Sequence, residues 1–114
     1  MSDDVTESIE WLALPDVAER LGETISRVRR LLDERALIAV RRDGVQKMPA
    51  AFLDGSRPLS SLRGTVIVLQ DVGFSDEEII DWLFRVEESL GNAPIESLLA
   101  GRKAEVRRVA QTLA

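Results

Sequence analysis

Leu14–Leu32 reads LPDVAERLGETISRVRRLL, and the spacing of its apolar residues favours two short helices joined by a tight turn. These residues are Val17, Ala18 and Leu21 in the first segment, and Ile25, Val28, Leu31 and Leu32 in the second. Gly22 suits the turn, because glycine readily takes a positive φ where a helix ends. Ala18 supplies the small side chain needed where two helices cross at roughly 90–120°. Val28, ten residues later, packs the second helix into the same core. The stretch therefore predicts a helix-turn-helix, with an ordinary packed helical hairpin as the alternative.

The second helix of this pair carries a basic polar face. At about 100° per residue, Ser26 and Arg30 fall at the centre of that face, and Arg27 and Arg29 lie at its flanks. Thr24 stands at the start of the helix, where its hydroxyl can cap free N–H groups and where DNA would approach. We therefore expect these residues to face DNA. The alternative is a solvated charged face, since arginine is a good helix former.

A β-hairpin is predicted directly after this helix. Leu37–Met48 reads LIAVRRDGVQKM, in which two apolar runs flank Asp43-Gly44, a pair typical of a type I′ turn. Pro49 ends the second strand, because proline cannot donate to a ladder. A hairpin after a recognition helix is a wing, whose cations can reach phosphates or the minor groove. The candidate contacts on the wing are Arg41, Arg42 and Lys47.

Charge is distributed unevenly along the chain. The 114 residues carry a formal net charge of −5, which taken whole argues against a nucleic-acid partner. Residues 1–19 hold six acidic and no basic side chains, whereas residues 20–63 hold ten basic and five acidic ones. This middle block contains the predicted helix-turn-helix and wing. Only this part of the chain suits a polyanion, which favours double-stranded DNA as the partner.

The composition argues against several other classes of protein. A chain of 114 residues with 45% hydrophobic content is enough for one compact unit. Cysteine and histidine are both missing from the sequence, so we expect no enzyme, no cofactor and no metal site. The N-terminus lacks the pattern of a signal peptide, and the longest apolar run, Val66–Leu69, is too short to span a bilayer. We therefore expect a cytoplasmic, nucleoid-associated protein that has no membrane contact.

The second half of the sequence favours helices. Leu59–Val72 is expected to be helical, although Val66–Leu69 also has the propensity of a buried strand. Ser75 begins a capping box with Glu78 at its third helical position. Two further helices follow, a short one from Pro94 and a last amphipathic one with the apolar residues Val106, Val109, Ala110 and Leu113. These helices either brace the DNA-binding part or, around Trp82, present a groove to a protein partner.

The predicted fold is mainly α with a small β-hairpin, a winged helix-turn-helix followed by a C-terminal helical bundle portion. We divide the chain into an acidic tail (1–13), a winged helix-turn-helix DNA-binding part (14–58) and a C-terminal helical part (59–114) packed into the same compact unit. The predicted function is sequence-preferring binding of duplex DNA, as a transcriptional regulator or nucleoid-associated factor. The alternative is a protein-interaction adaptor with little DNA affinity.

Three stretches carry a resemblance to a known family: residues 28–52 with LIAVRRDG, residues 71–84 with DVGFSDEEIIDWLF, and residues 92–114 with NAPIESLLAGRKAEVRRVAQTLA. Through them the chain resembles the actinobacterial winged helix-turn-helix DNA-binding proteins whose mycobacterial member is a Ser/Thr protein kinase substrate. The resemblance implies a helical C-terminal portion peculiar to the family, DNA binding, and phosphorylation of a threonine in the N-terminal tail. Thr6 is the one threonine of that tail. The resemblance therefore also implies a Ser/Thr protein kinase as a partner. The C-terminal portion is also similar to the toxin-binding domains of some bacterial antitoxins.

Overall fold

The computed structural model describes residues 9–113, and the predicted helix-turn-helix is confirmed at its start. Helix α1 (Leu14–Leu21) ends at Gly22, which has a left-handed φ of 66°. Helix α2 (Ile25–Asp33) begins after Thr24, whose Oγ1 accepts a hydrogen bond from the Arg27 N–H at 3.1 Å. The side chains expected at the crossing of the two helices are buried. The local signals for the turn and the cap were therefore sufficient to predict this unit.

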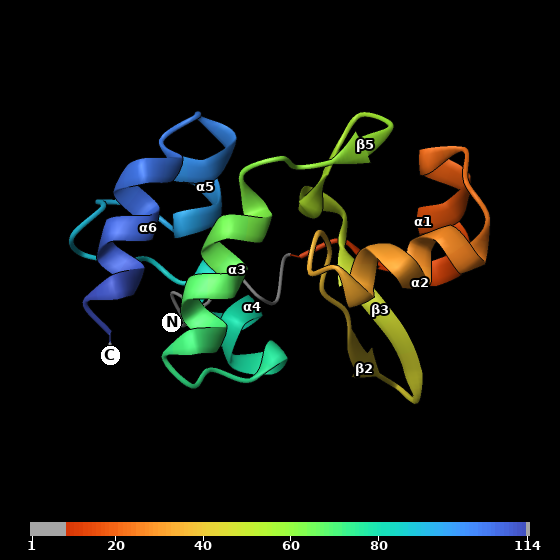
Figure 1. Ribbon diagram of the computed structural model, residues 1–114, viewed down its shortest axis with the longest axis horizontal. Helices are drawn as coiled ribbons and strands as arrows, with labels where there is room; N and C mark the ends of the chain where they lie inside the picture. Colours follow the sequence, from red (N-terminus) through yellow and green to blue (C-terminus); the bar gives the residue numbers. More distant parts are fainter. Residues whose placement is uncertain (1–8, 114) are drawn as a thin grey trace.

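The wing is confirmed as a hairpin of β2 (Val40–Arg42) and β3 (Val45–Pro49). Asp43 and Gly44 have φ values of 55° and 78°, the positive angles that a type I′ turn requires. The strands pair antiparallel, with Arg42 opposite Val45 beside the turn. The wing projects beside α2 in Figure 1, at the lower edge of the molecule.

A third strand, β1 (Trp11–Ala13), completes the sheet in the order β1-β3-β2. It pairs antiparallel with β3, placing Leu12 opposite Met48, and both side chains are buried. The charge pattern had assigned these three residues to the acidic tail, so the folded part begins before Leu14. The sequence does not predict β1, because three residues are too few to show the alternation typical of a strand and its partner strand lies far along the chain.

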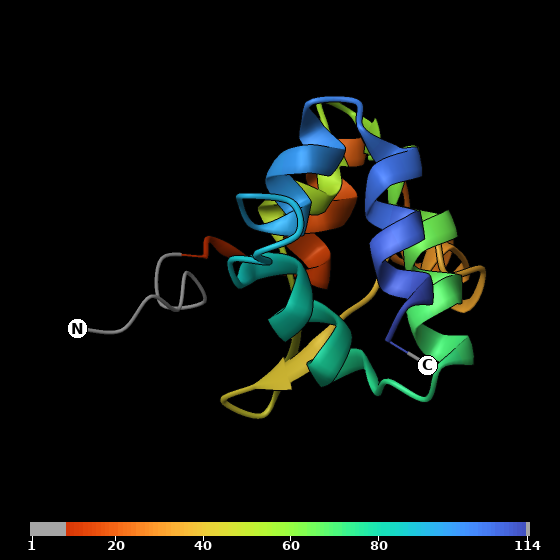
Figure 2. The ribbon, with the colours of Figure 1, turned by 90° about the vertical axis from the view of Figure 1, so that its left-hand side faces the viewer.

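The second half consists of helices joined by short connections. A 3-10 helix, η2 (Ala50–Phe52), and a small hairpin of two strands, β4 (Leu53–Asp54) and β5 (Arg57–Pro58), lead into it from the wing. The helices that follow are α3 (Leu62–Asp71), α4 (Asp76–Phe84), α5 (Pro94–Leu99) and α6 (Lys103–Gln111). Figure 2 shows α6 alongside α3. Val66–Leu69 is thus helical, as expected.

The capping box that begins α4 is confirmed with both of its hydrogen bonds. The Ser75 N–H donates to Glu78 Oε1 at 2.9 Å, and the Glu78 N–H donates to Ser75 Oγ at 3.2 Å. Hydrogen bonds with Ser75 hold the pKa of Glu78 below its ordinary value. The larger effect comes from the backbone of Ser75 and the smaller one from its hydroxyl. The first turn of α4 is consequently fixed in place at its capped end.

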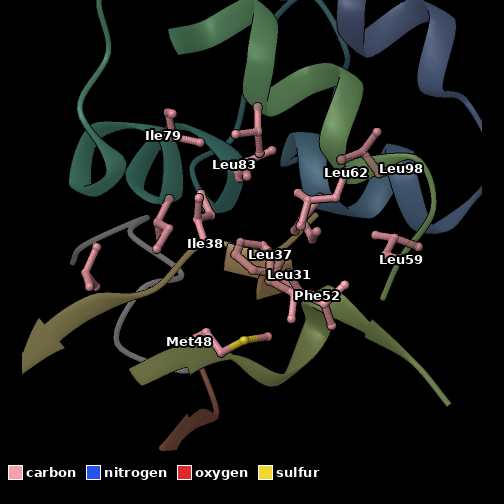
Figure 3. Packing of buried hydrophobic residues seen from close by; sticks show 14 of the residues in the cluster. Leu31, Leu37, Ile38, Met48, Phe52, Leu59, Leu62, Ile79, Leu83 and Leu98 are labelled. Carbon is pink, nitrogen blue, oxygen red and sulfur yellow. The ribbon is translucent and has the colours of Figure 1, made fainter. Parts of the chain in front are cut away.

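One hydrophobic core runs through both halves of the protein. It includes Leu31 of α2, Met48 of β3 and Leu83 of α4, which Figure 3 shows converging from different elements. Phe52 is fully buried between the halves, and its ring lies 5.9 Å from that of Phe84, with a tilt of 40° between them. In the described part of the chain, no helix combines the length and apolar character needed to cross a membrane.

Candidate nucleic-acid interface

Helix α2 presents the polar face that the sequence predicted. Val28 and Leu31 are buried against the core, whereas the opposite side of the helix is exposed. The structure places all five predicted residues of this helix on the exposed side, namely Thr24, Ser26, Arg27, Arg29 and Arg30. The face can therefore be reached by a large ligand along the length of the helix.

The arginines of this face keep their charge uncompensated by protein carboxylates. Within residues 9–113, none of Arg27, Arg29 and Arg30 has a carboxylate within the 4.0 Å of an ion pair. By contrast, Arg20 of α1 is engaged, since its Nη2 lies 3.1 Å from Glu10 Oε2. A guanidinium offers five N–H donors in a fork that matches phosphate oxygens and the acceptor edge of guanine. The exposed face of α2 is thus suited to an anionic ligand with acceptor atoms.

A shallow hollow lies between α2, the wing and the start of α1. Its volume is about 290 Å³, and it is lined by Leu14, Pro15, Arg29, Arg41, Gly44, Val45 and Gln46. Arg41 Nη1 donates to the Gly44 carbonyl at 3.0 Å, which holds this guanidinium at the turn of the wing. Two arginines from separate elements therefore share one open site, as expected for the binding of a backbone phosphate.

The three cations of the wing are divided between the two faces of the sheet. Successive side chains of a strand point to opposite faces, so Arg41 and Arg42 diverge. Arg42 stacks over the ring of Trp11 at 4.3 Å from its centroid, and its Nη2 is 4.0 Å from Glu77 Oε1. Lys47 is half-buried on the same face as Arg42. Only Arg41 joins the arginines of α2, although the sequence had grouped the three together.

Sequence reasoning missed Trp11, because only the register of β1 brings its ring beneath Arg42. Trp82, on which the alternative of a partner groove depends, is half-buried in an open hollow of about 210 Å³, together with Phe74, Glu78, Asp81 and Arg85. Thr6 lies outside the described residues. Among residues 9–113, no three acidic side chains gather in a way that could hold a metal ion.

Known proteins share this arrangement across both halves of the chain. Residues 1–53 match the family described as "DNA-binding protein Rv2175c, wHTH domain", and residues 59–114 match "Rv2175c C-terminal domain of unknown function". A Mycobacterium tuberculosis protein named "DNA-binding protein Rv2175c" is 40% identical over an alignment 114 positions long, and the alignment covers 89% of this chain and 78% of that protein. This chain belongs to the Rv2175c family.

The structure agrees with that membership. The NMR structure of Rv2175c superimposes with a TM-score of 0.84 at 35% identity, covering 93% of this chain and 82% of that one. The expected fold, a winged helix-turn-helix followed by a helical C-terminal part, is confirmed. The two stretches that match the Rv2175c family leave residues 54–58 between them, which form most of the β4–β5 hairpin.

Proposed function

We propose that this member of the Rv2175c family binds duplex DNA with a sequence preference, as a transcriptional regulator or nucleoid-associated factor. The observation that carries the proposal is the exposed face of α2, whose three arginines have no carboxylate partner within residues 9–113. In a winged helix-turn-helix this helix enters the major groove, and the wing lies beside it on the backbone. The name of the Mycobacterium tuberculosis relative supports the same function.

Different residues of the interface have different proposed roles. Ser26 and Arg30, at the centre of the exposed face, contact base edges, because they are farthest from the buried stripe. Arg29 and Arg41 share the hollow beside the wing and hold a backbone phosphate there. Arg27 flanks the face and contacts the backbone on the other side. Thr24 caps α2 and so fixes the end of the helix that enters the groove.

The remaining cations of the wing have supporting roles in this proposal. Arg42, stacked on Trp11, fixes the tilt of the wing relative to β1. Lys47 is half-buried farther from the turn, where it adds positive potential on that face. We propose that residues 14–58 carry the DNA contacts and that residues 59–114 support them from the same compact unit.

Arg30→Ala is expected to weaken binding to a preferred duplex by about 1–3 kcal/mol, because a bidentate contact to a base edge is lost. Binding to unrelated duplexes should change less. The preferred duplex would come from selection out of a random pool, and fluorescence anisotropy would give both dissociation constants. Arg30→Lys is the matched control for charge, since lysine keeps the cation and loses the planar fork.

Two outcomes would contradict the role given to Arg30. Equal losses on all duplexes would make it a phosphate contact, and no loss would remove α2 from the interface. A folded parent protein that binds no duplex even at low salt would contradict the proposed function itself. Salt-insensitive binding of a protein partner would then favour the adaptor alternative.

We further propose that a Ser/Thr protein kinase controls DNA binding through Thr6. Residues 1–13 carry four acidic side chains and no basic one, and they precede the basic surface by only a few residues. A phosphate on Thr6 would add about −1.5 to −2 charges and acceptor oxygens that arginine can bind. The modified tail would then compete with DNA for the arginines of α2, most strongly where salt screening is weak.

Phosphorylation of Thr6 is expected to weaken DNA binding. The loss of affinity should be larger at about 50 mM than at about 200 mM salt, because salt screens the attraction between the phosphate and the arginines. The protein would be treated with a bacterial Ser/Thr kinase, the phosphate located by mass spectrometry, and DNA titrated with both forms. Thr6→Ala treated in the same way is the control. Phosphate found only at other residues, or unchanged affinity at full modification, would contradict the proposal.

A further inference from the structure

Arg35 adopts a backbone conformation that residues with a side chain rarely take. It lies just past Glu34, the C-cap residue of α2, and has a φ of 62°, in the left-handed region. The Arg35 N–H donates to the Leu32 carbonyl at 3.1 Å, and the Ala36 N–H donates to the Leu31 carbonyl at 3.0 Å, which closes the end of the helix. Glycine is the usual residue at this place because it has no Cβ to clash. An arginine there needs an explanation from its side chain.

The side chain of Arg35 joins three helices. Its Nη2 lies 2.7 Å from Asp76 Oδ1, in the first turn of α4, and its Nε donates to Gln70 Oε1 at 3.4 Å, in the last turn of α3. The Arg35 side chain is 25% exposed, so this pair is less screened than one fully in water. In Figure 1, α2 runs from its turn with α1 toward α3 and α4. The end of the recognition helix is thus tied to the C-terminal helical part.

The wing approaches the same turn of α4 through a longer ion pair. Arg42, on β2, lies 4.0 Å from Glu77, the neighbour of Asp76. In the described part of the chain, these are the two ion pairs that connect residues 14–58 with residues 59–114. The capping box of Ser75 and Glu78 fixes the backbone that carries both acids. One capped turn therefore contacts both elements that the proposed function places on DNA, α2 through a close ion pair and the wing through a longer, exposed one.

We propose that the C-terminal helical part acts as a brace, in which Asp76 and Glu77 set the relative position of the recognition helix and the wing. The inference rests on the proposed DNA binding and assigns a role to the C-terminal part in it. Arg35 is a positioning residue in this scheme, because it acts through the orientation of α2. A braced surface meets DNA already ordered, so less conformational freedom is lost on binding.

Asp76→Asn gives the sharpest test, because the brace and simple electrostatics predict opposite signs. The substitution removes one negative charge from the protein, so charge alone would tighten binding to DNA. Loss of the brace instead weakens it, by about threefold to tenfold, as for residues that modulate coupling without touching a ligand. The slope of log K against log salt should stay unchanged, since no phosphate contact is removed. Dissociation constants would be measured at several salt concentrations on protein shown to be folded by circular dichroism.

Asp81→Asn is the matched control for this measurement. It makes the same chemical change in the same helix and breaks an ion pair of 2.6 Å, but that pair joins Asp81 to Arg85 within one turn of chain. Its DNA affinity should equal or slightly exceed that of the parent. Equal affinities of the Asp76→Asn and Asp81→Asn variants would overturn the brace and leave the proposed function intact.

A second measurement tests the brace without DNA. Because the sequence contains no cysteine, Ser26→Cys on α2 and Gln46→Cys on the wing create two unique sites for spin labels. Adding Asp76→Asn should broaden the distribution of distances between the labels, and adding Asp81→Asn should not. Equal widths would overturn the inference. A response of the label distances, together with an unlabelled parent protein that binds no duplex, would support the brace and refute the DNA-binding function separately.

Discussion

Phe52→Ala is expected to lower the free energy of unfolding by about 3–5 kcal/mol, the usual cost of removing a buried aromatic ring. Phe52 has no exposed surface, and its ring packs near that of Phe84 where the two halves of the core meet. Single domains are stable by only about 5–15 kcal/mol, so this loss is a large share of the total. Urea denaturation followed by circular dichroism would measure the change.

The same experiment tests whether the two halves fold together. Because one core spans them, the parent and the Phe52→Ala variant should each unfold in a single transition, with coincident curves from fluorescence and circular dichroism. Phe74→Ala, which makes the same change at a half-buried position, is the control and should cost less. Two separate transitions, or a loss at Phe52 no larger than at Phe74, would contradict the packing described here.

Arg29→Ala combined with Arg41→Ala is expected to weaken binding to every duplex by about eightfold near 0.1 M salt. Each phosphate contact contributes about 0.9 to the slope of log K against log salt, so loss of the one phosphate that both arginines hold accounts for this factor, and the slope should shrink by about 0.9. The loss should not depend on sequence, because the two arginines share the hollow assigned to a backbone phosphate. Titrations of two unrelated duplexes across a series of salt concentrations would measure both quantities.

Lys103→Ala combined with Arg108→Ala is the control for the loss of two positive charges. Both residues are exposed on α6, which lies at the opposite end of the molecule from α2 and the wing in Figure 1. This variant should change the slope little, because it acts only through screened, long-range potential. An unchanged slope in a folded Arg29/Arg41 variant would show that the hollow does not contact DNA.

Local patterns in the sequence were sufficient for the elements that define the family fold. The turn at Gly22, the type I′ pair Asp43-Gly44 and the capping box at Ser75 each depend on residues within a few positions of one another. Their physical causes, a permitted positive φ and a nearby acceptor for a free N–H, do not depend on the rest of the chain. The exposed side of α2 could also be predicted, because helical periodicity separates it from the buried Val28 and Leu31.

The assembly of the proposed site depended on contacts between distant residues. β1 is a strand only because β3 offers it a ladder, and that pairing brings Trp11 beneath Arg42. The pleat then separates Arg41 from Arg42, although they are neighbours in the sequence. Neither fact has a local signature, since both follow from the register between strands.

The sequence by itself thus determined which helices, turns and caps form, and which side of the recognition helix carries its arginines. Tertiary structure alone decided which of those arginines lie together. Arg29 meets Arg41 across a hollow between two elements, and Arg35 meets Asp76 across 41 positions of chain. Propensity and periodicity describe residues a turn or a pleat apart, whereas these pairings arise from the burial of one core shared by both halves.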